Sequence, residues 1–214
     1  PVAAFAIRTG AERQVYDQSE GTTEFAIDGN ALYVIKGTPY KLPRAAAADG
    51  RAELCALQLD SGDVLWSRAI ADEYTGGTFA VRGSRVVYHS ASGLTCLDSA
   101  TGEVLWTEAI PIKAVPPVTE RASAAVRRGK KPRTSELFSS NIHPTLVLTD
   151  DTVVCAIHDT MMAKRLADGK TLWSAPAGKN YMKSTEIFVA NALVWSRDLK
   201  GHDLSTGKVV RTLA

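Results

Sequence analysis

The stretch LDSATGEVLW, from Leu97 to Trp106, decides the fold. It has the form of a strand end, a tight turn at Thr101-Gly102 and a second strand that closes on a tryptophan. Glycine suits such a turn because it adopts a positive φ at little cost. Similar stretches recur as LDSGDVLW (Leu59 to Trp66), LADGKTLW (Leu166 to Trp173) and LSTGKVVR (Leu204 to Arg211). The recurrence predicts a repeat architecture.

The repeat is marked by four turn glycines and three tryptophans: Gly62, Trp66, Gly102, Trp106, Gly169, Trp173 and Gly207. Successive glycines are 40, 67 and 38 residues apart. A period of about 40 residues is typical of β-propellers. The long step therefore predicts one repeat plus an insertion of about 27 residues.

Between these marks each repeat contains a second pair of apolar runs, such as FAIDGNALYVI at 25–35 and FAVRGSRVVYH at 79–89. Val, Ile, Leu and aromatic residues around a short turn are typical of β-hairpins. Each unit is thus expected to hold four strands, A to D, with the tryptophan in strand D. No segment shows a helical period. The pattern predicts an all-β fold, a β-propeller of four-stranded antiparallel blades.

The chain divides into an N-terminal strand, four blades and one insertion. We expect the strand within 2–16, the blades at about 22–70, 75–110, 143–175 and 181–214, and a basic insertion loop at 111–142. Four blades and an extra strand predict that residues 1–214 are part of a larger propeller of up to eight blades. Its remainder, from the same polypeptide or another chain, is then the first expected partner.

The irregular connections are expected at one end of the blades. In an antiparallel meander the A–B and C–D turns lie at one end, here called the turn face, and the B–C and D–A connections lie at the other. The turns are short, whereas the B–C and D–A connections include the long stretch at 37–53 and the insertion at 111–142. Loops displayed on a rigid scaffold commonly carry function. The end with the B–C and D–A connections is therefore the candidate working face.

Polar residues at the ends of the B strands are the candidates for binding on the working face. They are joined by a histidine of the fourth blade and by cations of the insertion: Lys36, His89, His158, Asp159, Arg197, Asp198, His202, Arg127, Arg128, Lys130 and Lys131. Such a rim around a channel mouth suits an anionic or sugar-like ligand, a metal ion or a partner. The alternative is that these are ordinary solvated strand ends and, for the cations, a solvated loop. No residue is assigned a catalytic role.

The bulk properties exclude several classes of protein. A net charge of +2 gives no argument for nucleic acid or a membrane surface, and no apolar run is long enough to span a bilayer. No signal peptide is recognisable. Cys55, Cys96 and Cys155 are far apart in the sequence, so we expect buried free thiols, with one disulfide and an odd thiol as the alternative.

The repeat resembles that of the PQQ-like β-propeller family, roughly small-Leu-Asp-x-x-Thr-Gly-x-x-x-Trp. The full match is Leu97, Asp98, Thr101, Gly102 and Trp106. The copies that begin at Leu59 and Leu166 match with one residue deleted, and Arg211 or Val210 replaces the last tryptophan. The resemblance implies tryptophans that dock between blades and a periplasmic or extracellular location.

The resemblance also bears on cofactors. Catalytic members of the family bind PQQ beside a calcium ion held by Glu, Asn and Asp, often under a disulfide of adjacent cysteines. This sequence has no adjacent cysteines, and no such ligand set can be placed in it. We therefore favour no cofactor and expect a non-catalytic scaffold that binds a protein partner or a glycan. The alternative is part of a PQQ- and calcium-dependent alcohol or sugar dehydrogenase.

Overall fold

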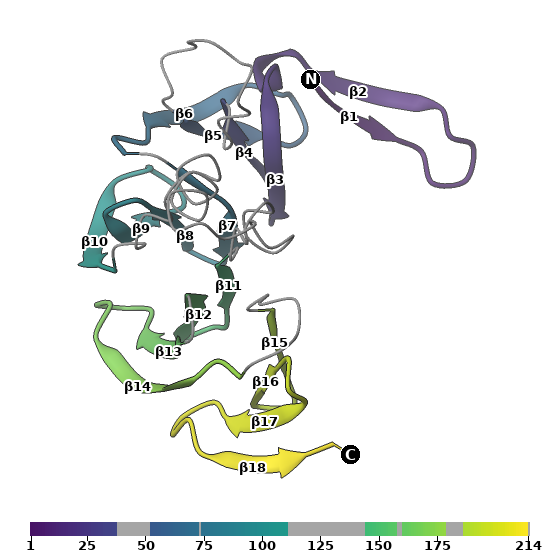
Figure 1. Ribbon diagram of the computed structural model, residues 1–214. Helices are drawn as coiled ribbons and strands as arrows, with labels where there is room; N and C mark the ends of the chain where they lie inside the picture. Colours follow the sequence, from purple (N-terminus) through teal and green to yellow (C-terminus); the bar gives the residue numbers. More distant parts are fainter. Residues whose placement is uncertain (38–51, 73, 111–143, 158–159, 179–185, 214) are drawn as a thin grey trace, which may run out of the picture.

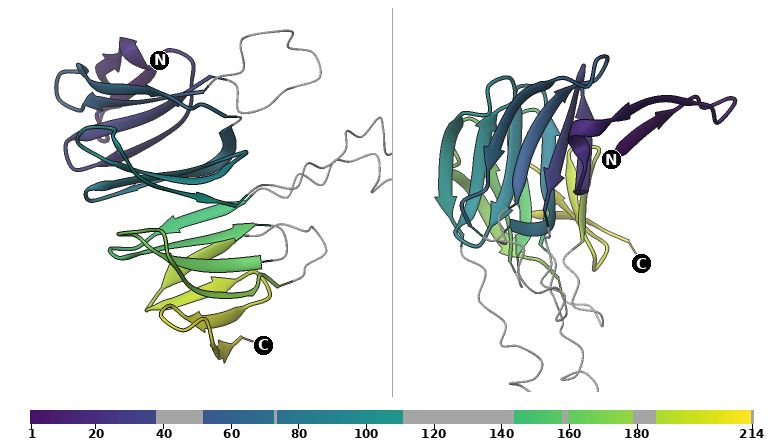
Figure 2. Two further views of the ribbon diagram at one scale, coloured as in Figure 1. Left: turned by 90° about the vertical axis from the view of Figure 1, so that its left-hand side faces the viewer. Right: turned by 90° about the horizontal axis from the view of Figure 1, so that it is seen from above.

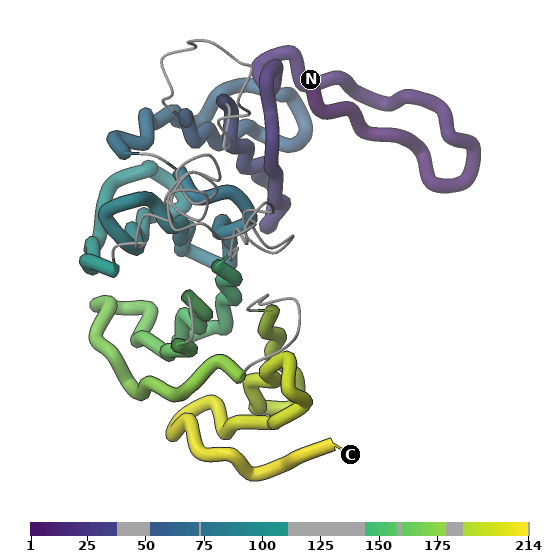
Figure 3. Tube along the Cα trace, viewed as in Figure 1, coloured from purple at the N-terminus to yellow at the C-terminus, as the bar shows by residue number. Residues whose placement is uncertain are grey.

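The computed structural model describes residues 1–37, 52–72, 74–110, 144–157, 160–178 and 186–213. Over these residues the chain forms four four-stranded antiparallel sheets and one two-stranded sheet. The four sheets follow one another along an arc, with both chain ends on its open side (Figures 1 and 3). The prediction of an all-β propeller of four-stranded blades is confirmed.

Each blade is a meander whose strands follow the chain order. Blade 1 contains β3 (Thr22–Asp28), β4 (Ala31–Lys36), β5 (Glu53–Gln58) and β6 (Val64–Ala69); blade 2 contains β7 (Tyr74–Arg82), β8 (Arg85–Ser90), β9 (Gly93–Asp98) and β10 (Val104–Ala109); blade 3 contains β11 (Thr145–Leu148), β12 (Thr152–Ile157), β13 (Thr160–Arg165) and β14 (Thr171–Pro176); blade 4 contains β15 (Ile187–Ala190), β16 (Leu193–Ser196), β17 (Lys200–Asp203) and β18 (Val209–Thr212). The A strands β3, β7, β11 and β15 contact one another in sequence and line the inner side of the arc (Figure 1). The D strands lie toward the outside.

The N-terminal residues differ from the single strand that we expected within 2–16. They form a hairpin of β1 (Val2–Phe5) and β2 (Glu12–Tyr16), paired from Val2 opposite Tyr16 to Phe5 opposite Glu12. The chain reverses at Ala6–Ala11, where the amide of Gly10 donates to the carbonyl of Ala6 at 2.8 Å. A turn of this kind joins two strands, so the apolar residues on both sides of it are in strands.

The core consists of layers between neighbouring sheets. In β4, alternate residues face opposite sides: Tyr33 and Ile35 pack toward blade 2, whereas Leu32 and Val34 pack toward the N-terminal hairpin. All four are almost fully buried because the B strand is covered on both faces. Runs of consecutive apolar residues are therefore required in the B strands.

Each tryptophan of the repeat docks on the next blade. Trp66 donates from Nε1 to the carbonyl of Ser99 at 2.9 Å, and its ring lies over Gly102, where an added Cβ would be 2.6 Å away. Trp106 and Trp173 repeat this arrangement. The indole of Trp106 donates at 2.8 Å to the carbonyl of the residue three positions before Gly169. The indole of Trp173 donates at 2.7 Å to the carbonyl of the residue three positions before Gly207. Glycine is thus required at these turns both for a positive φ and for the close approach of an indole.

The C–D turns all have the same length, and this corrects the alignment of the repeats that was made from the sequence. In blades 1 to 4 the turn glycine donates its amide to the carbonyl four residues earlier, at 2.8, 2.9, 2.9 and 2.8 Å. Leu59 and Leu166 are therefore equivalent to Ser99, and no residue is deleted. The sequence alignment matched the Leu-Asp pair of LDSATG with that of LDSG. Relative to the turn glycine, however, the two pairs lie two positions apart.

Candidate binding face

The strand ends that carry the long connections all lie at one end of the sheets. Gly37 and Ala52 flank the B–C connection of blade 1, and Ile110 and Pro144 flank the D–A connection between blades 2 and 3. Figure 2 shows these strand ends on the same side of the arc. The opposite end carries the A–B turns and the uniform C–D turns. The described strands thus have the two distinct faces that the strand order predicts.

Two of the predicted rim residues form ion pairs with strand ends of their own blade. Lys36, the last residue of β4, is 3.4 Å from Glu53 at the start of β5. Arg197 follows β16 and is 3.7 Å from Glu186. Both contacts are partly exposed and fasten neighbouring strands, so their stabilising effect is expected to be small.

His89 does not lie on an exposed rim. It is 1% exposed, and its Nε2 is 2.9 Å from the carbonyl of Ile110, while its Nδ1 is 3.2 Å from the hydroxyl of Thr75. The prediction of an exposed strand exit is corrected because β8 continues to Ser90 and turns directly into β9 at Gly93. His89 links strands A and B to the end of strand D within blade 2.

His202 is buried within β17 and not in an exposed B–C connection, which corrects the prediction for this residue. The connection consists of residues 197–199 and is closed by the amide of Leu199, which donates to Ser196 at 2.9 Å. The Nδ1 of His202 is 3.0 Å from the carbonyl of Gly207, which makes this nitrogen the donor. In blade 3 the equivalent residue, Lys164, donates to the carbonyl of Gly169 at 3.4 Å. A buried polar side chain at this position thus caps the turn carbonyl in blades 3 and 4.

Asp198 and His202 meet at Ser196, which raises the question of a serine–histidine–aspartate catalytic set. The hydroxyl of Ser196 donates to Asp198 at 2.5 Å and is 3.4 Å from Nε2 of His202. A nucleophilic serine needs its proton directed to the histidine, with the carboxylate on the far ring nitrogen. Here the proton is directed to the carboxylate, the far nitrogen faces a backbone carbonyl, and Ser196 is 2% exposed. The three groups form a buried structural network.

The Asp198 carboxylate is held against the end of blade 3. It is 2.7 Å from Lys200, and an added Cβ at Gly178 would be 2.6 Å from its Oδ1. Partial burial opposes ionisation, but the hydrogen bonds from Lys200 and Ser196 lower the pKa of Asp198 below its usual range. The carboxylate is thus kept charged by internal partners.

The remaining predicted rim residues, His158, Asp159, Arg127, Arg128, Lys130 and Lys131, lie outside the described residues, as does the 111–142 insertion. They stay predictions. The cysteines can be placed: Cys55, Cys96 and Cys155 are free and buried. Burial raises the pKa of the Cys96 thiol to about 11 and that of Cys155 to about 12, so both are protonated at neutral pH.

Among the described residues, neither a cluster of three or more His, Cys, Asp or Glu metal ligands nor a pair of adjacent cysteines is present. The three cysteines belong to different blades, so no pair of adjacent cysteines is available to cap a quinone. In the same part of the chain, no helix is long and apolar enough to cross a membrane.

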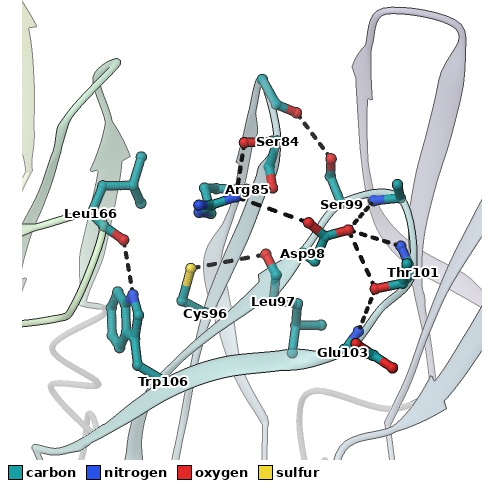
Figure 4. A network of polar contacts seen from close by, with 12 residues as sticks. Ser84, Arg85, Cys96, Leu97, Asp98, Ser99, Thr101, Glu103, Trp106 and Leu166 are labelled. Atoms are coloured by element: carbon teal, nitrogen blue, oxygen red, sulfur yellow. Dashed lines mark hydrogen bonds and ion pairs between the residues drawn. The ribbon is translucent and has the colours of Figure 1, made fainter.

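A hollow of about 440 Å³ lies on the turn face between blades 2 and 3, where the sequence pattern predicted no site. Arg85, Arg165, Asp150 and Asp151 contribute to its lining. The sequence contains one sign of this hollow. Arg165 occupies the position four residues before the turn glycine, where blades 2 and 4 have Asp98 and Asp203. In blade 2, Asp98 accepts from the amide of Thr101 at 3.1 Å and so closes its turn (Figure 4). In the hollow, Arg165 is 3.3 Å from Asp168 and Arg85 is 4.0 Å from Asp98, so both arginines already have partners.

Comparisons with known proteins agree with this geometry. The family model described as "Outer membrane protein assembly factor BamB" matches residues 2–131. BamB from Moraxella catarrhalis superposes with a TM-score of 0.55 at 17% identity, over 89% of this chain and 47% of that protein. The computationally designed Ika8 protein gives a TM-score of 0.50 at 15% identity, over 87% of this chain and 59% of that protein. No curated protein matches the sequence.

These similarities define the fold and the family but not the activity, because the identities are low and the chain spans only about half the length of the BamB structure. The matched residues include the hairpin, blade 1, blade 2 and the tryptophan docking between the two blades. On the family match over more than half of its length, the chain belongs to the PQQ-like propeller family described as outer membrane protein assembly factor BamB.

Proposed function

We propose that this chain is a non-catalytic propeller scaffold that binds a protein partner through its working face, in the periplasm or outside the cell. One observation carries the proposal: every long connection starts and ends at the same end of the sheets, whereas the opposite end has short A–B turns and C–D turns of one length. A rigid stack of blades with variable loops at one end is suited to recognising a macromolecule. The family's description as an assembly factor favours a protein over a glycan and suggests a partner in outer membrane protein assembly.

The polar groups of that face support a binding role. Of the described rim residues, His89 and His202 are buried and bonded internally, and Lys36, Arg197 and Asp198 pair with neighbouring strand residues. None of them belongs to a group of three or more His, Cys, Asp or Glu side chains that could hold a metal ion. We infer that these residues brace the loop bases, and that the connections themselves contact the partner, with the cations of the insertion contributing charge.

Site-specific photo-crosslinking in cells tests which face binds. A photoreactive residue at Ser92 or Leu199, both exposed in B–C connections, is expected to form an adduct with a partner protein. The matched controls are Ser61 and Ser205, exposed in C–D turns, where no such adduct is expected. Replacing residues 113–140 by a short Gly/Ser linker should abolish the adduct while leaving the melting temperature nearly unchanged. Adducts from the control positions alone would overturn the proposal.

Thermal unfolding with PQQ and calcium tests the quinoprotein alternative. A ligand at 100 times its Kd stabilises the folded state by about 2.7 kcal/mol, or roughly 5 to 10 °C for a chain of this size. We expect no shift at saturating PQQ and calcium. A shift of that size would favour the oxidoreductase.

A further inference from the structure

The C–D turn of blade 3 lacks the carboxylate that caps this turn in blades 2 and 4. In blade 2, Asp98 accepts from the amide of Thr101 (Figure 4). In blade 4, Asp203 accepts from the amide of Thr206 at 2.8 Å. Blade 3 has Arg165 at this position, and a guanidinium cannot accept a hydrogen bond.

Two backbone amides of the blade 3 turn are left without the acceptor that they have in blade 2. They belong to Ala167 and Asp168, which are two and three residues after Arg165. In the described part of the chain, neither amide has an acceptor. The carboxylate of Asp168 instead accepts from the amide of Lys170 at 3.1 Å. The turn itself keeps its shape, because the amide of Gly169 still donates to Arg165 at 2.9 Å.

The uncapped turn borders the hollow between blades 2 and 3. Arg165 and Ala167 contribute to its lining from blade 3, and Arg85 does so from blade 2. Each guanidinium is bonded through Nη1 alone: that of Arg165 donates to Asp168 at 3.3 Å, and that of Arg85 donates to the carbonyl of Ser84 at 2.9 Å. Among the described residues, their Nε and Nη2 atoms have no hydrogen-bond partner. Donors arranged in this planar fork match a carboxylate.

The aspartates at the rim of the hollow restrict the kind of anion that fits. Asp150 is 2.6 Å from Nε of Arg82, and Asp151 accepts from the hydroxyl of Thr152 at 2.9 Å. Both therefore have internal partners, but their charges still oppose an anion that carries several charges. A group with a single negative charge is favoured over a phosphate or a polyanion.

The equivalent place in blade 4 shows which ionisation state it favours. Hydrogen bonds from Ser205 and Thr206 lower the pKa of Asp203 below its usual range. A turn of this kind thus stabilises a charged carboxylate. In blade 3 the donors remain but the carboxylate must come from elsewhere.

We propose that the hollow between blades 2 and 3 binds a single carboxylate, which accepts from the amides of Ala167 and Asp168 and pairs with Arg165. The bound group takes the place that the Asp98 carboxylate has in blade 2. Its source is either an acidic side chain of another protein or a small carboxylic acid. The site lies on the turn face, so the inference does not depend on the function proposed for the working face.

An NMR titration of the full chain at constant ionic strength tests the proposal. The probes are acetate and the blocked peptide acetyl-Gly-Asp-Gly-amide, and the peptide with Asn in place of Asp is the neutral control. We expect the amide signals of Ala167 and Asp168 to shift saturably with a Kd of about 1 to 10 mM, since one carboxylate makes few contacts. The neutral peptide should shift neither signal. A peptide that binds about tenfold more tightly than acetate would identify a protein segment as the source, whereas equal affinities would identify a small acid.

Arg165→Asp is the decisive substitution, because it restores the residue of blades 2 and 4 and supplies an internal carboxylate to the two amides. We expect binding to weaken by about tenfold or more and the melting temperature to stay equal or rise slightly. The matched control is Lys170→Asp, which changes the net charge equally at a neighbouring side chain that is 75% exposed. It should weaken binding by less than about threefold, because exposed charges are screened.

Three results would overturn the proposal. The first is the absence of a saturable shift of the two amides at about 50 mM acetate or peptide. The second is equal weakening by Arg165→Asp and Lys170→Asp, which would indicate general charge attraction. The third is binding of sulfate as tight as that of acetate, which would indicate an unselective anion site. None of these results bears on crosslinking at the working face, so the two proposals can fail separately.

Discussion

The interface between the N-terminal hairpin and blade 1, at Gly62, is packed differently from the interfaces between blades, at Gly102, Gly169 and Gly207. At the last three, a single tryptophan covers the turn glycine and donates to the carbonyl three residues before it. At Gly62 the two tasks are divided. The side chain of Gln14 lies nearest to the glycine, at 3.3 Å from an added Cβ, and the hydroxyl of Tyr16 donates to Leu59.

The comparison separates shape from hydrogen bonding. The interface needs a side chain that lies close to a residue without a Cβ, and it needs a donor for a carbonyl that the turn leaves free. Tryptophan supplies both because its ring is flat and its only polar atom is a donor. Gln14 and Tyr16, two residues apart on one strand, point to the same face and together meet the same needs. Substitutions can therefore test the two requirements independently.

The largest effect is expected from Trp66→Ala. It removes both tasks at once and leaves a cavity between blades 1 and 2, so the free energy of unfolding should fall by about 4 kcal/mol. The comparison substitution is Gln14→Ala, at the equivalent position of the hairpin, which should cost only about 1 kcal/mol because Tyr16 keeps its hydrogen bond. Urea unfolding followed by tryptophan fluorescence measures both. Equal losses would mean that the hairpin does not use its side chains as the blades do.

Gly102→Ala tests the close approach and should cost about 3 kcal/mol. The residue has φ near +71°, and its new Cβ would be 2.6 Å from the ring of Trp66, so conformational strain and overpacking add together. Gly10→Ala is the matched control, because its φ is +67° but an added Cβ would meet nothing within 4 Å. Strain alone should cost it about 1 kcal/mol. If both variants lose the same stability, the contact with the indole contributes nothing.

Much of this fold could be predicted because its repeat signals are local. The turn glycines, the tryptophans and the alternating apolar runs depend on residues close in sequence, and they were sufficient for the blade architecture. The role of Tyr16 could not be recognised in the same way. It lies six residues after Gly10, so its equivalence to an indole appears only when the acceptor on the next blade is known. The four blades have Arg68, Glu108, Ala175 and Leu213 at this position.

The binding face was less predictable because burial depends on where a strand ends. His89 and His202 stand next to turn-forming residues, which favours exposure, but β8 extends to Ser90 and β17 already contains His202. A shift of one or two residues in a strand boundary moves a side chain from solvent into a layer between sheets. Polar residues in such a layer are then bound to backbone carbonyls, as His202 is to Gly207. The strand order, by contrast, depends only on the number of strands, and the described strand ends that flank the long connections do lie at one end of the sheets.

Tyr16→Phe should have a smaller effect than Trp66→Ala and Gly102→Ala, and it gives the sharpest test of hydrogen bonding. It keeps the ring, which is 4% exposed, but removes the donor to the Leu59 carbonyl, so we expect a loss of about 1 to 2 kcal/mol. Tyr33→Phe is the matched control, because its hydroxyl donates to the carbonyl of Ser99, which also accepts from Trp66 at 2.9 Å. That carbonyl keeps a partner, so the control should lose less than about 0.5 kcal/mol. If Tyr33→Phe loses as much stability as Tyr16→Phe, the loss is determined by the removed hydroxyl and not by the unsatisfied carbonyl. The division of roles between Gln14 and Tyr16 would then have to be explained by packing alone.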